Sequence, residues 1–117
     1  MKYMLLIVGD EEAMNAATPV DATGMSDDYA AYNAAMAKAG ILLGGERLRP
    51  SSRTATVRVR DGKAKVLDGP YSDTKEQMGG YYLIEVADHD QAIAWASRCP
   101  AARFGTIEVR PIWPTHE

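Results

Sequence analysis

Three carboxylates in this sequence could carry acid–base chemistry. Asp68 and Glu76 stand at the two ends of a turn-rich segment, and Glu46 follows a pair of glycines in an apolar run. A carboxyl group held against apolar or aromatic walls has a raised pKa and can exchange a proton near neutral pH. We therefore take Asp68, Glu76 and Glu46 as the candidate catalytic residues of a small-molecule enzyme that uses carboxylate acid–base chemistry.

A structural role is an open alternative for each of these carboxylates. The side chain of Asp68 can accept hydrogen bonds from backbone N–H groups within a turn. Glu46 can form a salt bridge with an arginine, although the adjacent Arg47 points to the opposite face of a strand. Glu76 is the best functional candidate of the three, because it stands just before a second glycine pair, where a ligand can approach the backbone closely.

Three tyrosines are the candidate ligand-binding residues: Tyr3, Tyr71 and Tyr81. A tyrosine ring offers a ligand an apolar surface and a polar tip. Aromatic residues on strands also pack in cores and interfaces, so a packing role stays open for Tyr3 and Tyr81. Tyr71 lies between the carboxylates of the turn-rich segment.

The residues needed for other site chemistries are missing. The histidines, His89 and His116, show no His/Cys spacing typical of a zinc site, and no Ser/His/Asp order or phosphate-binding Gly-rich loop occurs. The single Cys99 lies on the apolar side of an expected helix, where a free thiol is typically a small buried side chain. We expect no metal and no cofactor.

The composition is that of one small globular domain over residues 1–117, with 46% hydrophobic and 25% charged residues. The net charge of -3 and the absence of a Lys/Arg block argue against direct binding to nucleic acid. The longest apolar run, Met4 to Val8, is far shorter than the roughly 20 residues of a membrane span. A lone cysteine fits a reducing compartment, so we expect a cytoplasmic protein.

Sequence periodicity predicts the elements that position these residues. Apolar runs and period-2 alternation predict strands over residues 3–8, 41–48, 54–60, 63–67, 81–86 and 106–112. Helices are expected over residues 26–39 and 88–99, each beginning at a Ser or Asp that can cap its first turn. Residues 10–25 contain a proline and a glycine and are predicted to form a long loop.

Glycines mark the expected turns and irregularities. Gly40 ends the first helix, and Asp61 and Gly62 form the turn of a hairpin. The pair Gly44 and Gly45 predicts either a bulge or a close approach of the backbone to another group.

This order of elements predicts an α+β fold. It is a ferredoxin-like βαββαβ arrangement with an added hairpin strand and an antiparallel sheet. Two helices cover one face of such a sheet. The strands at 3–8 and 81–86 carry apolar side chains on both faces, so we expect the partner subunit of a homodimer to bury the second face.

The segment from Asp68 to Val86, DGPYSDTKEQMGGYYLIEV, closely resembles the YCII-related family in its DGPF branch. The resemblance extends over residues 3–7, 44–48 and 108–113, and so covers almost the whole chain. It implies a dimeric ferredoxin-like α/β barrel in bacterial proteins that are often encoded near extracytoplasmic-function sigma factors. It implies no known reaction.

The sequence departs from the family pattern at two points. Tyr71 stands where the signature has Phe, and the His-Asp pair proposed as catalytic in the wider family has no candidate His before the signature. That catalytic proposal is therefore not carried over. The sigma-factor association leaves a second function open, namely a non-catalytic ligand-binding or protein-interaction module linked to transcriptional regulation. A dimeric scaffold without a ligand is a third.

Overall fold

A computed structural model of the protein describes residues 1–17, 26–70 and 76–114. The strands are β1 (Lys2–Asp10), β2 (Leu42–Arg47), β3 (Ala55–Arg60), β4 (Lys63–Asp68), β5 (Glu76–Glu85) and β6 (Thr106–Pro111). The helices are α1 (Glu11–Ala17), α2 (Asp27–Lys38) and α3 (His89–Arg98), with short 3₁₀ turns η1 (Ser51–Arg53) and η2 (Pro100–Arg103).

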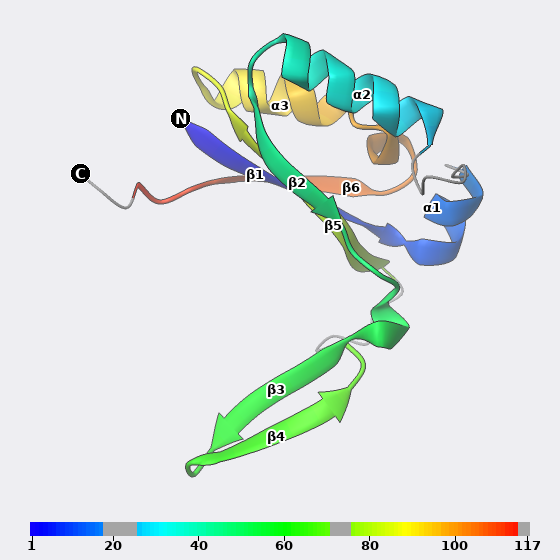
Figure 1. Ribbon diagram of the computed structural model, residues 1–117, viewed down its shortest axis with the longest axis vertical. Coiled ribbons are helices and arrows are strands. Elements are labelled where there is room, and N and C mark those ends of the chain that lie inside the picture. The colour runs from blue at the N-terminus through cyan, green and yellow to red at the C-terminus, as the bar shows by residue number, and fades with distance from the viewer. Residues whose placement is uncertain (18–25, 71–75, 115–117) are drawn as a thin grey trace.

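The main sheet is antiparallel and has the strand order β2-β5-β1-β6. Figure 1 shows α2 and α3 side by side on one face of this sheet. The predicted α+β, ferredoxin-like fold is confirmed. The predicted hairpin also forms, but β3 and β4 pair only with each other, in a two-stranded sheet separate from the main one.

The hydrophobic core lies between the sheet and the two covering helices. Alternate residues of β1 point into it, so that Tyr3, Leu5 and Ile7 are buried while their neighbours are half-buried. Met36 of α2 and Ile84 of β5 are fully buried against them. Among the described residues, the two long helices both lie on this face of the sheet, and neither covers the other face (Figure 1).

The expected loop over residues 10–25 is wrong in its first half, where α1 follows β1 directly. The Asp10 carboxylate accepts a hydrogen bond from the backbone N–H of Ala13 at 3.1 Å. Glu11 and Glu12 lie in the first turn of α1, where their negative charges interact favourably with the positive end of the helix dipole. Met14 packs against the core. This packing is the reason that so short a helix forms, and the local sequence pattern does not indicate a contact with distant residues. Residues 18–25 lie outside the described residues.

The other predicted local signals hold. Ser26 and Asp88 each accept a hydrogen bond from the backbone N–H three residues later and so cap α2 and α3. Gly40 has a φ of 74° after α2, and Asp61 and Gly62 have φ values of 54° and 74° at the hairpin turn. These left-handed conformations favour glycine and tolerate aspartate.

β5 begins at Glu76, well before the expected start of this strand at Tyr81. Its first residues pair with the end of β1, where Asp10 lies opposite Glu76 and Gly9 opposite Gln77. This pairing uses backbone groups, so the polar residues of the segment do not oppose it. A bulge at Gly79 shifts the register between the two halves of the strand.

The hairpin of β3 and β4, residues 55–68, is called the arm below. In Figure 1 the arm projects from the sheet on the side opposite to α2 and α3. Its base is fixed by the backbone N–H of Gly69, which donates to Thr54 O at 2.7 Å, and by the Thr56 hydroxyl, which donates to Gly69 O. The radius of gyration is 16.0 Å, against roughly 13 Å for a compact chain of this length.

Truncation of the core should cost much more stability than truncation at the surface. We expect Leu5→Ala to lower the free energy of unfolding by about 3 kcal/mol, because Leu5 is fully buried in the central strand. The matched control is Ile93→Ala on α3, where the side chain is 45% exposed and the expected change is within about 0.5 kcal/mol. Urea denaturation measures both. Equal losses would contradict the assigned core.

Candidate functional site

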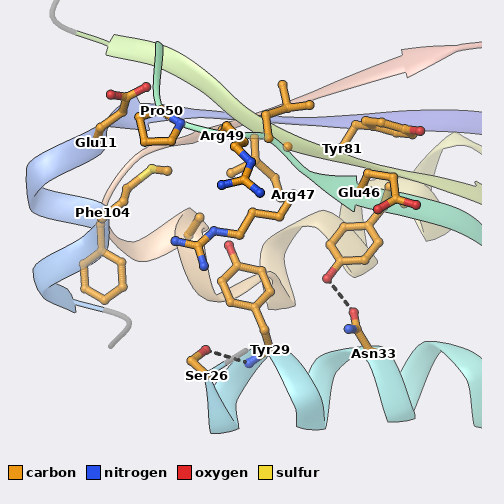
Figure 2. Close-up of a pocket in the computed structure, with 18 residues that line it drawn as sticks. Glu11, Ser26, Tyr29, Asn33, Glu46, Arg47, Arg49, Pro50, Tyr81 and Phe104 are labelled. Carbon is orange, nitrogen blue, oxygen red and sulfur yellow. Dashed lines mark hydrogen bonds between the residues drawn. The ribbon is translucent and has the colours of Figure 1, made fainter. Parts of the chain in front are cut away.

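A pocket of about 330 Å³ opens between the start of α2, the end of β2 and the first half of β5. Figure 2 shows side chains of these elements pointing into it, together with Phe104 and Glu11 at its far side. The pocket lies on the helix-covered side of the sheet, at the end of the sheet from which the arm departs. It is the site that the described residues build most completely.

Glycines make the space for this pocket. A Cβ atom on Gly80 would lie 2.8 Å from the backbone oxygen of Glu46, and one on Gly45 would lie 2.7 Å from the backbone oxygen of Tyr81. The two strands therefore approach closely where side chains are absent, and the face toward α2 is left unfilled. The predicted irregularity at the first glycine pair is confirmed, because the register of β2 shifts between Leu42 and Gly44.

Two arginines are the positively charged residues that line the pocket. Arg47 lies opposite Gly80 in the sheet, which places its side chain on the helix-covered face. Arg49 follows just after the end of β2. In Figure 2 both guanidinium groups reach into the space between β2 and α2, and the hydroxyl of Tyr29 points toward them. Guanidinium groups in this setting favour an anion, above all a carboxylate or phosphate.

Apolar and aromatic side chains form the rest of the wall. Phe104, Ile7 and Met14 line one part of the pocket, and Tyr29 and Tyr82 line another. The Tyr82 hydroxyl donates to the side-chain oxygen of Asn33, as drawn in Figure 2. This mixture of an apolar wall with few polar groups is typical of small-molecule sites.

Two tyrosines of the pocket, Tyr29 and Tyr82, are neutral at ordinary pH. Burial raises the pKa of Tyr82 to about 12, and the neighbouring Cys99 adds to this shift. Burial likewise raises the pKa of Tyr29 and of Tyr32, again with a contribution from Cys99. Because a neutral phenol keeps its proton, Tyr29 can donate a hydrogen bond to an anionic ligand.

The free thiol of Cys99 is part of the structure around these tyrosines. It is buried, and its sulfur lies 3.9 Å from the Tyr29 hydroxyl. Burial also raises the pKa of the Cys99 thiol, which keeps it in the unreactive protonated form. This agrees with the small buried side chain that the sequence predicts.

The structure does not bring the three predicted carboxylates together. Glu46 lines the pocket, but it lies opposite Tyr81 in the sheet and so points to the other face from Arg47. Asp68 is exposed at the end of β4, and Glu76 is exposed at the start of β5. Neither of these two lines the pocket. A shared catalytic role of the three stays a prediction.

The predicted ligand-binding tyrosines separate in the same way. Tyr81 lines the pocket. Tyr3 is 1% exposed in the core, with its ring 5.7 Å from that of His89. This is the packing role that the sequence left open for it. Tyr71 lies outside the described residues, as do residues 72–75.

Sequence reasoning missed the arginines and Tyr29 as site residues. Arg47 and Arg49 end an otherwise apolar strand segment, which is a weak signal for a site. Glu11 was likewise missed. Its carboxylate accepts hydrogen bonds from the Ser51 backbone N–H at 2.7 Å and from the Ser51 hydroxyl at 3.2 Å, so it ties α1 to η1 beside the pocket.

A family model described as the YCII-related domain matches residues 1–116. The chain belongs to the YCII-related family. An uncharacterised protein of Rhizobium meliloti (strain 1021) is 35% identical over 114 residues, which cover 96% of this chain and 92% of that relative. The family membership that the DGPY segment indicates is thereby confirmed.

Within the ranges that the structure describes, no three His, Cys, Asp or Glu residues gather in a way that could hold a metal ion. The helices of those same ranges are all too short or too polar to cross a membrane.

The tyrosine cluster should make stability fall at alkaline pH. The pKa of Tyr82 is about 12 in the folded protein against an ordinary value of 10.0, so the folded state holds this proton more tightly than the unfolded state. Its contribution to stability is complete below pH 10 and is lost as the pH rises toward 12. Urea denaturation across this range measures the decline.

Two variants assign this alkaline decline to the cluster. Tyr82→Phe and Tyr32→Phe should each have a flatter dependence of stability on pH than the unsubstituted protein, because each removes one titrating phenol. A decline of unchanged steepness in both variants would show that other groups cause it.

Proposed function

We propose that this YCII-related protein binds a small anionic molecule with an apolar body in the pocket between α2, β2 and β5. The observation that supports this proposal is the placement of the Arg47 and Arg49 guanidinium groups above an aromatic wall. The pocket volume of about 330 Å³ is at the lower end of the range for small-molecule sites. A ligand of the size of an aromatic or short branched carboxylic acid fits it.

Each part of the pocket supplies a different part of the binding energy. The two arginines offer several N–H donors to the charged group, and a charge-assisted hydrogen bond is stronger than a neutral one. The neutral Tyr29 hydroxyl adds a further donor beside them. Phe104 and Tyr82 provide apolar surface for the body of the ligand. The carboxylate of Glu11 accepts hydrogen bonds from Ser51 at the far side of the pocket.

A thermal-shift screen with benzoate, a branched aliphatic carboxylate and their neutral amides tests the proposal. Carboxylates should raise the melting temperature and the amides should not, since a ligand that binds only the native state stabilises it. Arg49→Gln should weaken carboxylate binding by roughly tenfold or more, because a charged hydrogen bond is lost. Calorimetric titration measures the dissociation constants.

The matched control is Arg98→Gln. Arg98 carries the same charge but stacks on Trp95, with its guanidinium carbon 4.3 Å from the centre of the ring, and does not line the pocket. The Arg98→Gln variant should bind carboxylates with the same affinity as the unsubstituted protein. Equal binding of acids and amides, or equal weakening in both arginine variants, would contradict an anion site at this pocket.

Catalysis at this pocket is the extension of the proposal that the sequence favours. Glu46 supports it, because it is the one predicted catalytic carboxylate that lines the pocket. Its side chain points to the other face of the sheet from Arg47, so it would act on a part of the ligand away from the arginines, where a carboxylate could accept a proton as the ligand reacts. Without turnover, the same pocket makes the chain a non-catalytic ligand-binding module, which fits the regulatory association implied by the family resemblance.

Glu46→Gln distinguishes these two versions. For a catalytic Glu46 we expect turnover of a binding acid to fall by at least about 100-fold while the dissociation constant changes little. The readouts are product formation by NMR and calorimetric titration with the same acid. The control is Glu108→Gln, an exposed glutamate on β6 away from the pocket. Loss of binding in Glu46→Gln, or unchanged turnover, would remove the catalytic role of Glu46.

A further inference from the structure

The carboxylate of Glu11 is fixed in position at the far side of the pocket. It accepts hydrogen bonds from the Ser51 backbone N–H at 2.7 Å and from the Ser51 hydroxyl at 3.2 Å. The Glu11 side chain is half-buried. Within the part of the chain that the structure describes, it forms no ion pair with Arg47, Arg49 or any other cation. Its negative charge is therefore available to a bound molecule.

The surroundings of Glu11 favour an ammonium group over a metal ion. A metal ion needs several oxygen, nitrogen or sulfur ligands, and no three His, Cys, Asp or Glu residues gather for one among the described residues. Phe104 lies on the same side of the pocket as Glu11 (Figure 2). The face of an aromatic ring attracts a cation. The Phe104 ring makes such a contact with Arg103, whose guanidinium carbon lies 5.5 Å from the ring centre.

The pocket therefore carries opposite charges on its two sides. Figure 2 shows the Arg47 and Arg49 guanidinium groups between β2 and α2, whereas Glu11 lies at the far side. Glu46 also lines the pocket, but it is exposed and points to the other face of the sheet from Arg47. Met14 adds apolar lining. A molecule that satisfies both sides has a carboxylate at one end, a cationic group at the other and an apolar spacer between them.

We propose that Glu11 binds an ammonium group of the ligand, so that the ligand of this pocket is an ω-amino acid with an apolar spacer. The inference rests on the proposed function, because the carboxylate of the amino acid lies on Arg47 and Arg49. The hydrogen bonds from Ser51 orient Glu11 before the ligand binds, which lowers the entropy cost of forming the ion pair. In a pocket that excludes water, this charge-assisted contact is stronger than it is in solvent.

Calorimetric titration with matched pairs of ligands tests the proposal. Each pair consists of a plain acid and the same acid with a terminal amino group: butyrate and γ-aminobutyrate, valerate and δ-aminovalerate, caproate and ε-aminocaproate. At the spacer length that spans the two sides, the amino acid should bind at least about tenfold more tightly than its plain acid, because a charge-assisted hydrogen bond is gained. The terminal alcohol of the same length should gain much less, since a hydroxyl group carries no charge.

The variant Glu11→Gln assigns this gain to one carboxylate. In this variant the amino acid and its plain acid should bind with equal affinity, and binding of the plain acid should not weaken. Glutamine keeps the shape of glutamate and can accept a hydrogen bond from Ser51, so circular dichroism should be unchanged. The matched control is Glu12→Gln. This neighbouring glutamate on α1 is exposed and does not line the pocket, so the control should retain the full gain.

The two proposals fail in different ways. Plain acids that bind as tightly as their amino acids at every spacer length would overturn the ammonium site and leave the proposed function intact. A gain that persists in Glu11→Gln would do the same. If neither member of any pair binds, both proposals are overturned. The ligand pairs give this result with the unsubstituted protein, so the test does not depend on the folding of a variant.

The variant Arg49→Gln provides the converse check. Because Arg49 contacts the carboxylate that both members of a pair share, this variant should weaken the plain acid and the amino acid by the same factor. Glu11→Gln should weaken the amino acid alone.

Discussion

The pairing of β1 with β5 is the interaction on which the rest of this structure depends. These two strands form the centre of the sheet, β6 is added to β1, and β2 is added to β5. Their alternate side chains supply most of the strand contribution to the core. Because antiparallel partners must keep one register to keep one face buried, this pairing decides which residues of the chain meet the helices.

The candidate site is a consequence of the same pairing. The close approach of β5 to β2 requires residues without side chains at Gly80 and Gly45. The bulge at Gly79 allows the long β1 to stay paired as far as Asp10. The missing side chains leave a hollow beneath α2. Arg47 points into that hollow because it is opposite Gly80 in the register. The glycines that permit tight strand pairing therefore also open the pocket.

The pocket and the arm are connected at the end of β2. Leu48, Arg49 and Pro50 line the pocket and also line a second hollow at the base of the arm. The backbone N–H of Leu48 donates to Gly79 O at 2.9 Å, which fixes this segment to β5. A change in the position of the arm would therefore act on Arg49.

The sequence by itself determined the elements whose signals are local. Caps at Ser26 and Asp88, the turn at Asp61 and Gly62 and the alternation of the strands depend on neighbours in the chain, and the DGPY segment indicated the family. Only the tertiary structure decided which distant residues meet. Arg47 from β2 and Tyr29 from α2 meet at the pocket only once the helix has packed on the sheet. In the same way, α1 forms because Met14 packs on the core. Asp68 and Glu76 stand close together in the sequence, at the two ends of the turn-rich segment, yet strand pairing places them in different sheets. Backbone hydrogen bonding and core burial, rather than separation along the chain, decide where side chains lie.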